Sequence, residues 1–331
     1  MRRTHRLIAA GFAASLALSA PTAALAVPAQ ADAELAARYL MAQADDHNVS
    51  TPGERADLVI ALAAAGGQDR RATAEATVLA TNSEEYVTDN AAAAKTLIAL
   101  DAGCVDHSQL HDKLLAGMAE DGSVGSFPSA FGQSLVIIGL HRSGQEIPPI
   151  VVDRLKAWQT GADGSFEYED FATGEPTFDA DGTALAALAL DLAGDEAASD
   201  RALSALESRQ TEQGYWENYS PVNTTGLVAD ALESDGRDVA EAQAWLAGQQ
   251  QADGGFPSAL GSTDSDLMAT TQAMFGVTGN GYTDAAVDCD ADGPIIDTGY
   301  APVDTSPLAA LALGGLLTTA GAATVVVAGR R

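Results

Sequence analysis

The most constraining feature of this sequence is a helix-pair unit that recurs along its interior. Each copy has an amphipathic helix, a loop rich in Gly, Asp and aromatic residues, and an Ala/Leu-rich helix that stops at glycine. The stop positions are Gly66, Gly103, Gly144, Gly194, Gly236 and Gly279. Glycine there fits the left-handed residue that ends many helices. Such units stack and bury each other's apolar faces, in an open solenoid or a closed ring.

The composition favours helices over strands. Aromatic residues make up only 5% of the 331 residues, while hydrophobic residues reach 47%. Ala- and Leu-rich sequence favours helix, whereas strands are enriched in aromatic and β-branched residues. The first helices of the units are expected through residues 39–43, 78–82, 114–118, 156–159, 206–210 and 245–249. We therefore predict an all-α fold with one domain over residues 27–289.

Both ends of the chain predict export and a membrane tether. Residues 1–26 combine a basic start, an apolar run and a small-residue cleavage site, as secretory signal peptides do. Residues 307–328 carry no charge and can cross ~30 Å of hydrocarbon as a helix. The tail 329–331 ends in two arginines, which favour the cytoplasmic side. Residues 290–306 would form an acidic linker, with the domain on the extracellular face of the membrane.

The tail also resembles Gram-positive cell-wall sorting signals, so attachment to the cell wall is an alternative. The exported part is strongly acidic. Without the five terminal arginines the chain keeps 12 basic residues against 46 acidic ones, a net charge of about −34. Such a field repels nucleic acids, anionic lipid surfaces and polyanionic ligands. We therefore expect no nucleic-acid partner.

Three loops share a pattern directly after the first helix of their unit. Residues 162–166 read Ala-Asp-Gly-Ser-Phe, 212–216 read Glu-Gln-Gly-Tyr-Trp and 252–256 read Ala-Asp-Gly-Gly-Phe. These segments resemble the Gln/Trp repeats of the terpene cyclase and protein prenyltransferase toroid superfamily. In that superfamily the second helix of each pair lines a six-fold α/α barrel. The resemblance implies a toroid of six helix-pair repeats around a central cavity.

Within that superfamily the chain most resembles the cobalamin-binding toroid of the intrinsic factor and transcobalamin proteins. Those proteins are secreted and continue after the sixth pair into a short segment that ends in a disulfide Cys, as residues 279–289 do here. Their small β domain, which closes over the corrin, has no counterpart in this sequence. The resemblance implies an open-faced ligand, with a corrinoid as the named candidate and no other cofactor. A surface transporter or a second binding domain would be the partner.

Cys104 and Cys289 are the two cysteines of the chain, an even number in an oxidising compartment. In a closed ring the sixth unit lies beside the first, and the first beside the second. A tail that leaves the sixth unit can then reach Cys104, which follows the second. We expect Cys104 and Cys289 to form a disulfide.

An enzymatic alternative rests on residues 178–184, Phe-Asp-Ala-Asp-Gly-Thr-Ala. They resemble the Asp-any-Asp-Asp-Thr-Ala motif of class II terpene cyclases, in which the middle Asp protonates an alkene or epoxide. The resemblance makes Asp181 that acid, assisted by Asp179, although Gly182 replaces the third acid. Asp is also a favoured cap at a helix start. Comparable points of the other units hold Asn90, Ser129, Asn223 and Asp266.

No metal site is predicted. His107 and His111 have helical i, i+4 spacing but no third ligand in the sequence around them, so we interpret them as solvated. The Asp-Ala-Asp-Gly segments at 179–182 and 290–293 lack the Glu that completes an EF-type calcium loop.

A ligand is expected at the starts of the second helices and in the loops before them. The candidate residues are Phe127, Phe131, Gln133, Tyr168, Phe178, Asp179, Asp181, Trp216, Tyr219, Asn223, Phe256 and Asp264. The first aromatic residue of a loop, as in Trp216 and Phe256, would also serve as a wedge between repeats. The sequence favours a non-catalytic, cell-surface toroid that binds a small apolar or planar ligand. A cyclase-like enzyme and a structural wall protein are the alternatives.

Overall fold

The computed structural model describes residues 30–126, 128–170 and 172–290. These residues are mostly helical, with one two-stranded sheet, which confirms the predicted all-α class. The helices are α1 (Ala33–Asp45), α2 (Pro52–Ala65), α3 (Asp69–Asn82), α4 (Asn90–Ala102), η1 (Ser108–Lys113), α5 (Ala130–Arg142), α6 (Pro149–Ala157), α7 (Ala180–Leu192), α8 (Glu196–Ser208), α9 (Pro221–Ser234), α10 (Ala240–Gln249) and α11 (Leu267–Thr278). The strands are β1 (Glu167–Glu169) and β2 (Pro176–Phe178).

The segments predicted to direct export lie outside the described residues. They are the signal peptide 1–26, the linker beyond residue 290, the span 307–328 and the tail 329–331. Phe127 lies outside as well. None of the described helices is both long enough and apolar enough to cross a membrane.

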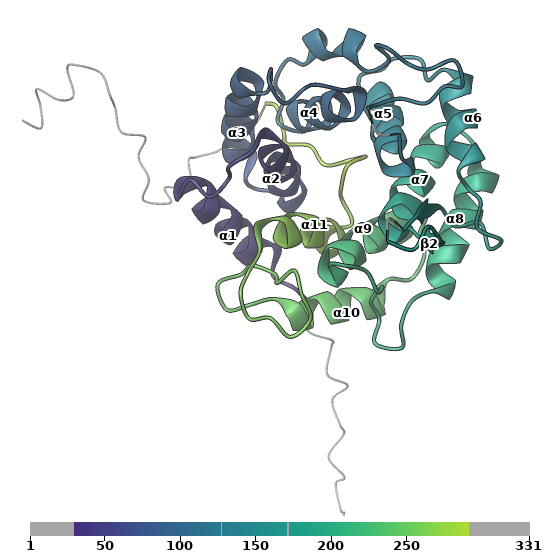
Figure 1. The fold of residues 1–331 in the computed structure, drawn as a ribbon. Helices are drawn as coiled ribbons and strands as arrows, with labels where there is room; N and C mark the ends of the chain where they lie inside the picture. Colours follow the sequence, from purple (N-terminus) through teal and green to yellow (C-terminus); the bar gives the residue numbers. More distant parts are fainter. Residues whose placement is uncertain (1–29, 127, 171, 291–331) are drawn as a thin grey trace, which may run out of the picture.

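Six helices pack side by side in a closed order. Along the chain, α2 contacts α4, α4 contacts α5, α5 contacts α7, α7 contacts α9 and α9 contacts α11, and α11 returns to α2. Figure 1 shows this ring along its axis, with α1, α3, α6, α8 and α10 around its outside. Each of these five contacts one or two members of the ring. We call the two sets the inner and the outer helices.

The sequence predicts an outer helix through residues 114–118, and this prediction is wrong. The chain instead forms the short 3₁₀ helix η1 and then turns. The buried side chain of Asn90 replaces the missing helical hydrogen bonds, since its Nδ2 donates to the carbonyl oxygens of residues 113, 114 and 116 at 2.9 to 3.0 Å. Asn90 therefore holds this loop rather than capping α4.

Other predicted caps are confirmed at the starts of the inner helices. Ser129 accepts a hydrogen bond from the third residue of α5, Asp179 from that of α7 and Asp266 from that of α11. The cap of α4 is Asp89, one residue before the predicted Asn90. Asn223 lies inside α9 and does not cap it. These bonds use backbone N–H groups that a helix start leaves unpaired.

A glutamine at the end of an outer helix joins the loop that follows it to the start of another outer helix. Gln159 donates through Nε2 to a carbonyl oxygen of its own loop and to the oxygen of Ala198 in α8, at 2.8 and 2.9 Å. Gln250 does the same with its own loop and with Asp32, the cap of α1, whose N–H it also accepts at 2.8 Å. Because Asp32 begins the first helix, this last contact joins the end of the ring to its start.

Residues 280–290 form a strap across the ring, drawn in yellow-green in Figure 1. The predicted disulfide is confirmed, because Cys289 of the strap is bonded to Cys104 with their Cα atoms 5.7 Å apart. Arg142, at the end of α5, donates to the strap oxygens of Tyr282 and Ala285 at 3.1 and 2.8 Å. Since Cys104 and Arg142 lie at the ends of α4 and α5, the strap covers the side where the inner helices finish.

The middle of the ring is filled. Eight consecutive residues are buried in each of α5 (133–140), α7 (183–190) and α11 (269–276). Eight residues make more than two helical turns, so the face toward the ring axis is buried too. Side chains therefore pack against one another at the centre.

The inner helices begin on the side of the ring opposite the strap. We call this side the mouth.

Candidate functional site

Three candidate residues contribute to packing at the mouth. Trp216 and Phe256 are fully buried, and Trp216 donates through Nε1 to the carbonyl oxygen of Leu206 at 2.8 Å. Gln133 is also fully buried, and its side chain donates to the carbonyl oxygens of residues 122 and 151 at 2.9 and 3.0 Å. These side chains hold the loops to the helices and reach no open surface.

Large apolar side chains are exposed at the mouth. Tyr168, Tyr219, Leu260 and Met268 are 44%, 100%, 51% and 47% exposed. Tyr168 lies in strand β1, Tyr219 and Leu260 lie in loops before inner helices, and Met268 lies in the first turn of α11. The other large apolar side chains that are exposed among the described residues are those of Val78 and Ile150, on outer helices. The sequence predicts the two tyrosines but not Leu260 and Met268, because a Leu in a loop and a Met in an apolar helix carry no distinguishing pattern.

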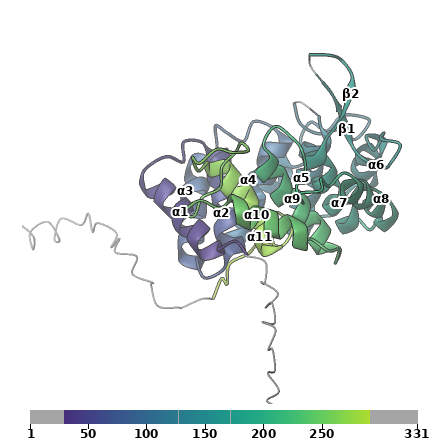
Figure 2. The same ribbon diagram turned by 90° about the horizontal axis from the view of Figure 1, so that it is seen from below.

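The strands β1 and β2 form a hairpin that projects from the mouth, as Figure 2 shows. Its base is fixed by Arg209, whose guanidinium carbon lies 4.3 Å from the ring centre of Phe178. The same guanidinium forms an ion pair with Asp163 at 2.6 Å. Tyr168 of the hairpin is thus presented on an anchored support, while Asp264 is exposed on the loop before α11.

The two aspartates of the acid motif have different environments. Asp179 caps α7, accepting the N–H of Gly182 at 2.8 Å. Asp181 lies in the first turn and caps nothing. Its Oδ2 accepts a 3.4 Å hydrogen bond from Asn218, while its Oδ1 is buried without a partner. The hydroxyl of Thr224, on α9, is likewise buried and has no partner among the described residues.

Burial is the main cause that raises the pKa of Asp181 to about 6, and the neighbouring Asp179 carboxylate raises it further. The nearby side chains of Thr224 and Asn218 act in the opposite direction. Burial also raises the pKa of Asp179. Asp181 is therefore an acid that takes up a proton in mildly acidic surroundings, and its Oδ1 is buried without a hydrogen-bond partner.

Protonation of an alkene needs more than a suitable acid. The reaction also needs an apolar, aromatic chamber that excludes water from the cation. Asp181 stands at the mouth, and residues 183–190 behind it are buried against neighbouring helices. The geometry supports a buried acid at this position but not a closed, aromatic chamber around a cation.

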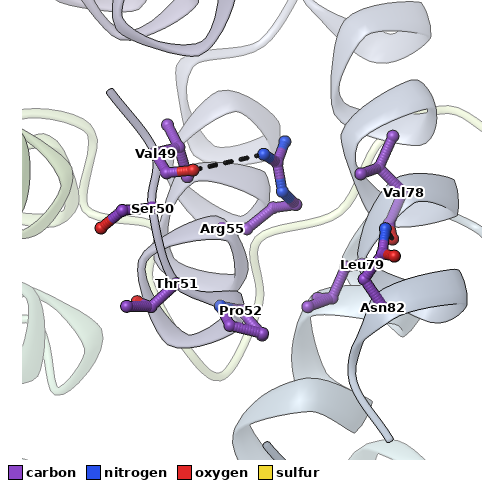
Figure 3. Close-up of a pocket in the computed structure, with 8 residues that line it drawn as sticks. All are labelled: Val49, Ser50, Thr51, Pro52, Arg55, Val78, Leu79 and Asn82. Carbon is purple, nitrogen blue, oxygen red and sulfur yellow. Dashed lines mark hydrogen bonds between the residues drawn. The ribbon is translucent and has the colours of Figure 1, made fainter. Parts of the chain in front are cut away.

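Two surface cavities of the described residues lie between inner and outer helices. One, of about 160 Å³, separates the start of α2 from α3 (Figure 3). Arg55 donates to the carbonyl oxygen of Val49 at its wall and forms an ion pair with Glu75, so its charge is already neutralised. The other, of about 390 Å³, lies between the end of α7 and the start of α6. Neither is lined by a candidate ligand residue.

Comparison with known proteins yields no matching family model and no matching relative among curated proteins. No group of three or more His, Cys, Asp or Glu side chains is placed to hold a metal ion in the described part of the chain. The function is therefore argued from the geometry of the mouth.

Proposed function

We propose that this chain is a cell-surface, non-catalytic six-repeat α/α toroid that binds a small planar or apolar ligand over its mouth. The closed contacts of the inner helices and the link from Gln250 to Asp32 support the toroid. The signal-like and membrane-span-like ends of the sequence support the location.

The observation that carries the binding role is the gathering of Tyr168, Tyr219, Leu260 and Met268 at one side of the ring. Exposed apolar side chains that cluster on one face typically mark a surface that binds something. Aromatic rings there add flat contact area for a planar ligand.

The filled ring centre decides how a ligand would lie. A flat molecule such as a corrinoid would rest on the mouth with its opposite face open, rather than enter the ring. The open face would suit a second binding domain or a surface transporter. The strongly acidic exported part favours a neutral or cationic ligand over an anionic one.

The test is binding by the purified full-length chain. Cobalamin binding is followed by absorbance and equilibrium dialysis, and the neutral planar dye Nile red by fluorescence. The double variant Tyr219→Ser/Met268→Ser should lower the affinity at least about tenfold, since it removes two apolar contacts of about 1.4 kcal/mol or more in total. Ile150→Ser, on the outer helix α6, is the control and should bind normally. Failure of both probes to bind, or equal losses in the two variants, would overturn the proposal.

A terpene-cyclase-like enzyme is the second candidate, favoured by the raised pKa and the unpartnered Oδ1 of Asp181. It would initiate carbocation cyclisation or isomerisation of a non-phosphorylated isoprenoid by proton transfer from Asp181. Incubation with squalene and product analysis by gas chromatography test this role. A product formed by the wild-type chain and lost in Asp181→Asn would establish the enzyme, and the absence of product from the wild type would reject it.

A further inference from the structure

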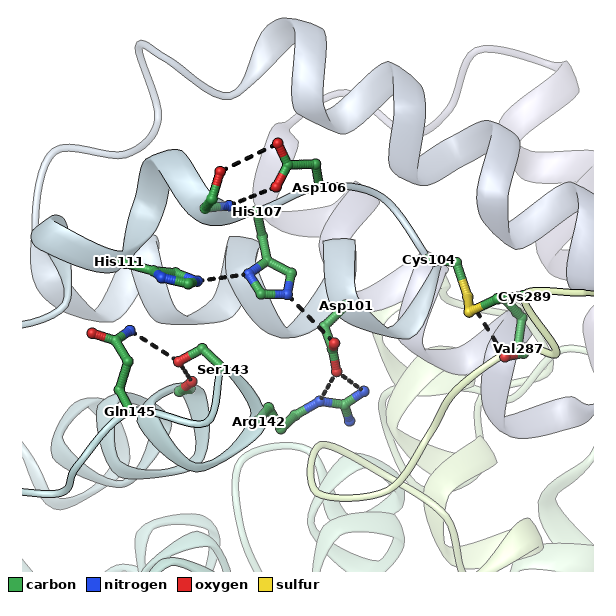
Figure 4. Close-up of polar contacts among 12 residues, drawn as sticks. Asp101, Cys104, Asp106, His107, His111, Arg142, Ser143, Gln145, Val287 and Cys289 are labelled. Atoms are coloured by element: carbon green, nitrogen blue, oxygen red, sulfur yellow. Dashed lines mark hydrogen bonds and ion pairs between the residues drawn. A yellow bond between two sulfur atoms is a disulfide. The ribbon is translucent and has the colours of Figure 1, made fainter.

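A second cluster of polar side chains lies away from the mouth, beside the disulfide (Figure 4). His107 Nδ1 and His111 Nε2 face each other at 3.1 Å, and the two rings are tilted by 39°. His107 immediately precedes η1 and His111 lies within it, so both side chains start from one short, hydrogen-bonded segment. Both rings are partly exposed to solvent.

The separation of the two nitrogens suits a shared metal ion. An ion ~2.05 Å from each nitrogen, a usual Zn–N distance, would subtend an angle of about 100° at the observed 3.1 Å separation. That angle lies between the values for square or octahedral and tetrahedral coordination. Two facing imidazole nitrogens otherwise need one proton between them, and a cation can take its place.

Two carboxylates complete the surroundings. Asp101 Oδ1 lies 3.5 Å from His107 Nε2, the ring nitrogen that does not face His111, and Asp101 is itself paired with Arg142 at 2.7 Å. Histidine ligands commonly have a carboxylate beside the second ring nitrogen, which orients the ring and increases its basicity. Asp106 is held by the N–H and hydroxyl of Ser108 at 3.0 and 3.2 Å.

Asp106 directly precedes His107 in the chain, and the two hydrogen bonds from Ser108 fix the orientation of its carboxylate. Its negative charge favours a cation at that place.

We propose that His107 and His111 bind one divalent transition-metal ion, such as Zn²⁺ or Cu²⁺, through their facing ring nitrogens. Water fills the remaining positions, Asp101 orients His107 and Asp106 supplies charge. Imidazole ligands suit these ions, whereas Mg²⁺ and Ca²⁺ prefer oxygen. The sequence suggested solvated histidines, because the i, i+4 spacing shows neither the facing nitrogens nor the approach of Asp101 from the end of α4.

The experiment uses the full-length chain without a histidine tag. Zn²⁺ is titrated by isothermal calorimetry, and Cu²⁺ by electron paramagnetic resonance, in which splitting from two nitrogen ligands identifies the pair. We expect one equivalent of metal to bind, with the affinity reduced at least about tenfold in His107→Gln and in His111→Gln. Asp106→Asn should weaken binding less, since Asp106 supplies charge and is not a ligand, and the Asn oxygen can still accept the N–H of Ser108.

His141→Gln is the matched control, because it removes an exposed imidazole at the end of α5. Circular dichroism without metal shows whether each variant is folded. Wild-type affinity in folded His107→Gln and His111→Gln, or an equal loss in His141→Gln, would overturn the proposal. So would a wild-type chain that binds neither ion.

Discussion

The hydroxyl of Tyr282 donates a 2.9 Å hydrogen bond to Asp57 Oδ1, joining the strap to α2 across 225 positions of sequence. The other oxygen of Asp57 accepts from Lys95 of α4 at 2.6 Å. Tyr282 is fully buried, and its ring meets Phe275 of α11 edge-on with centroids 5.1 Å apart. The strap is thus part of the core rather than an appended tail.

Replacing Tyr282 by Phe should lower the free energy of unfolding by about 1–3 kcal/mol, because a buried carboxylate oxygen loses its donor. Urea denaturation measures the change. Tyr219→Phe is the matched control and should have no effect, since Tyr219 is fully exposed. Equal stabilities of the two variants would contradict the role given to Tyr282.

Removing the disulfide with Cys104→Ser/Cys289→Ser should cost up to about 5 kcal/mol, because the bond closes a loop with a sequence separation of 185. Thermal denaturation should show a lower Tm for the double variant than for the wild type. A reducing agent should lower the Tm of the wild type and leave that of the variant unchanged. If neither the double substitution nor the reducing agent changed the Tm, the strap would be held in place without the disulfide.

Asp181→Asn should stabilise the protein at neutral pH. A carboxyl whose folded pKa is raised to about 6 holds its proton more tightly in the native state, so stability falls as pH rises from about 4 to 6. Asn has no such dependence. The gain at pH 7.5 should be up to about 3 kcal/mol, reduced by the solvent that reaches the side chain, and it should vanish near pH 4.

Denaturation curves across this pH range test the prediction, with Asp264→Asn, an exposed substitution on the loop before α11, as control. A loss of stability at pH 7.5 would mean that Asp181 makes a favourable contact in the folded state.

Gly226→Ala should destabilise the contact between α9 and α11 by about 1–3 kcal/mol. A Cβ at Gly226 would come within 2.7 Å of the Cα of Ala273, where the helix backbone cannot easily move. Gly248→Ala, on α10, meets nothing within 4 Å and should stabilise the protein by about 0.5–1 kcal/mol through helix propensity. Urea denaturation should therefore show a lower free energy of unfolding for Gly226→Ala and a higher one for Gly248→Ala.

The ends of the inner helices could be predicted from sequence, with one instructive exception. Five of the six chosen glycines have positive φ, whereas Gly103 has φ −94° and Cys104 takes the left-handed position with φ 58°. Gly103 serves a different need, because a Cβ there would lie 2.5 Å from the Cβ of Ala76 on α3. A sequence shows that glycine is present, but not whether a positive φ or a close contact at the Cβ position requires it.

The candidate site was less predictable. Loop aromatics were identified, but burial separates Trp216 and Phe256 from the exposed Tyr168 and Tyr219, and burial depends on neighbouring units. A missed signal is the threonine of the following inner helix, which accepts the backbone N–H of the loop aromatic. The pairs are Phe166 with Thr183, Trp216 with Thr225 and Phe256 with Thr270.

The bond between Cys289 and Cys104 also determines how the domain would carry mechanical load. A pull on the chain beyond residue 290 reaches Cys289 first and passes through sulfur to Cys104, at the end of α4. Helix α11 is therefore not peeled from the ring, and the residues between the two cysteines are bypassed by the force. A protein held by that end could resist shear at the cell surface without unfolding its last repeat.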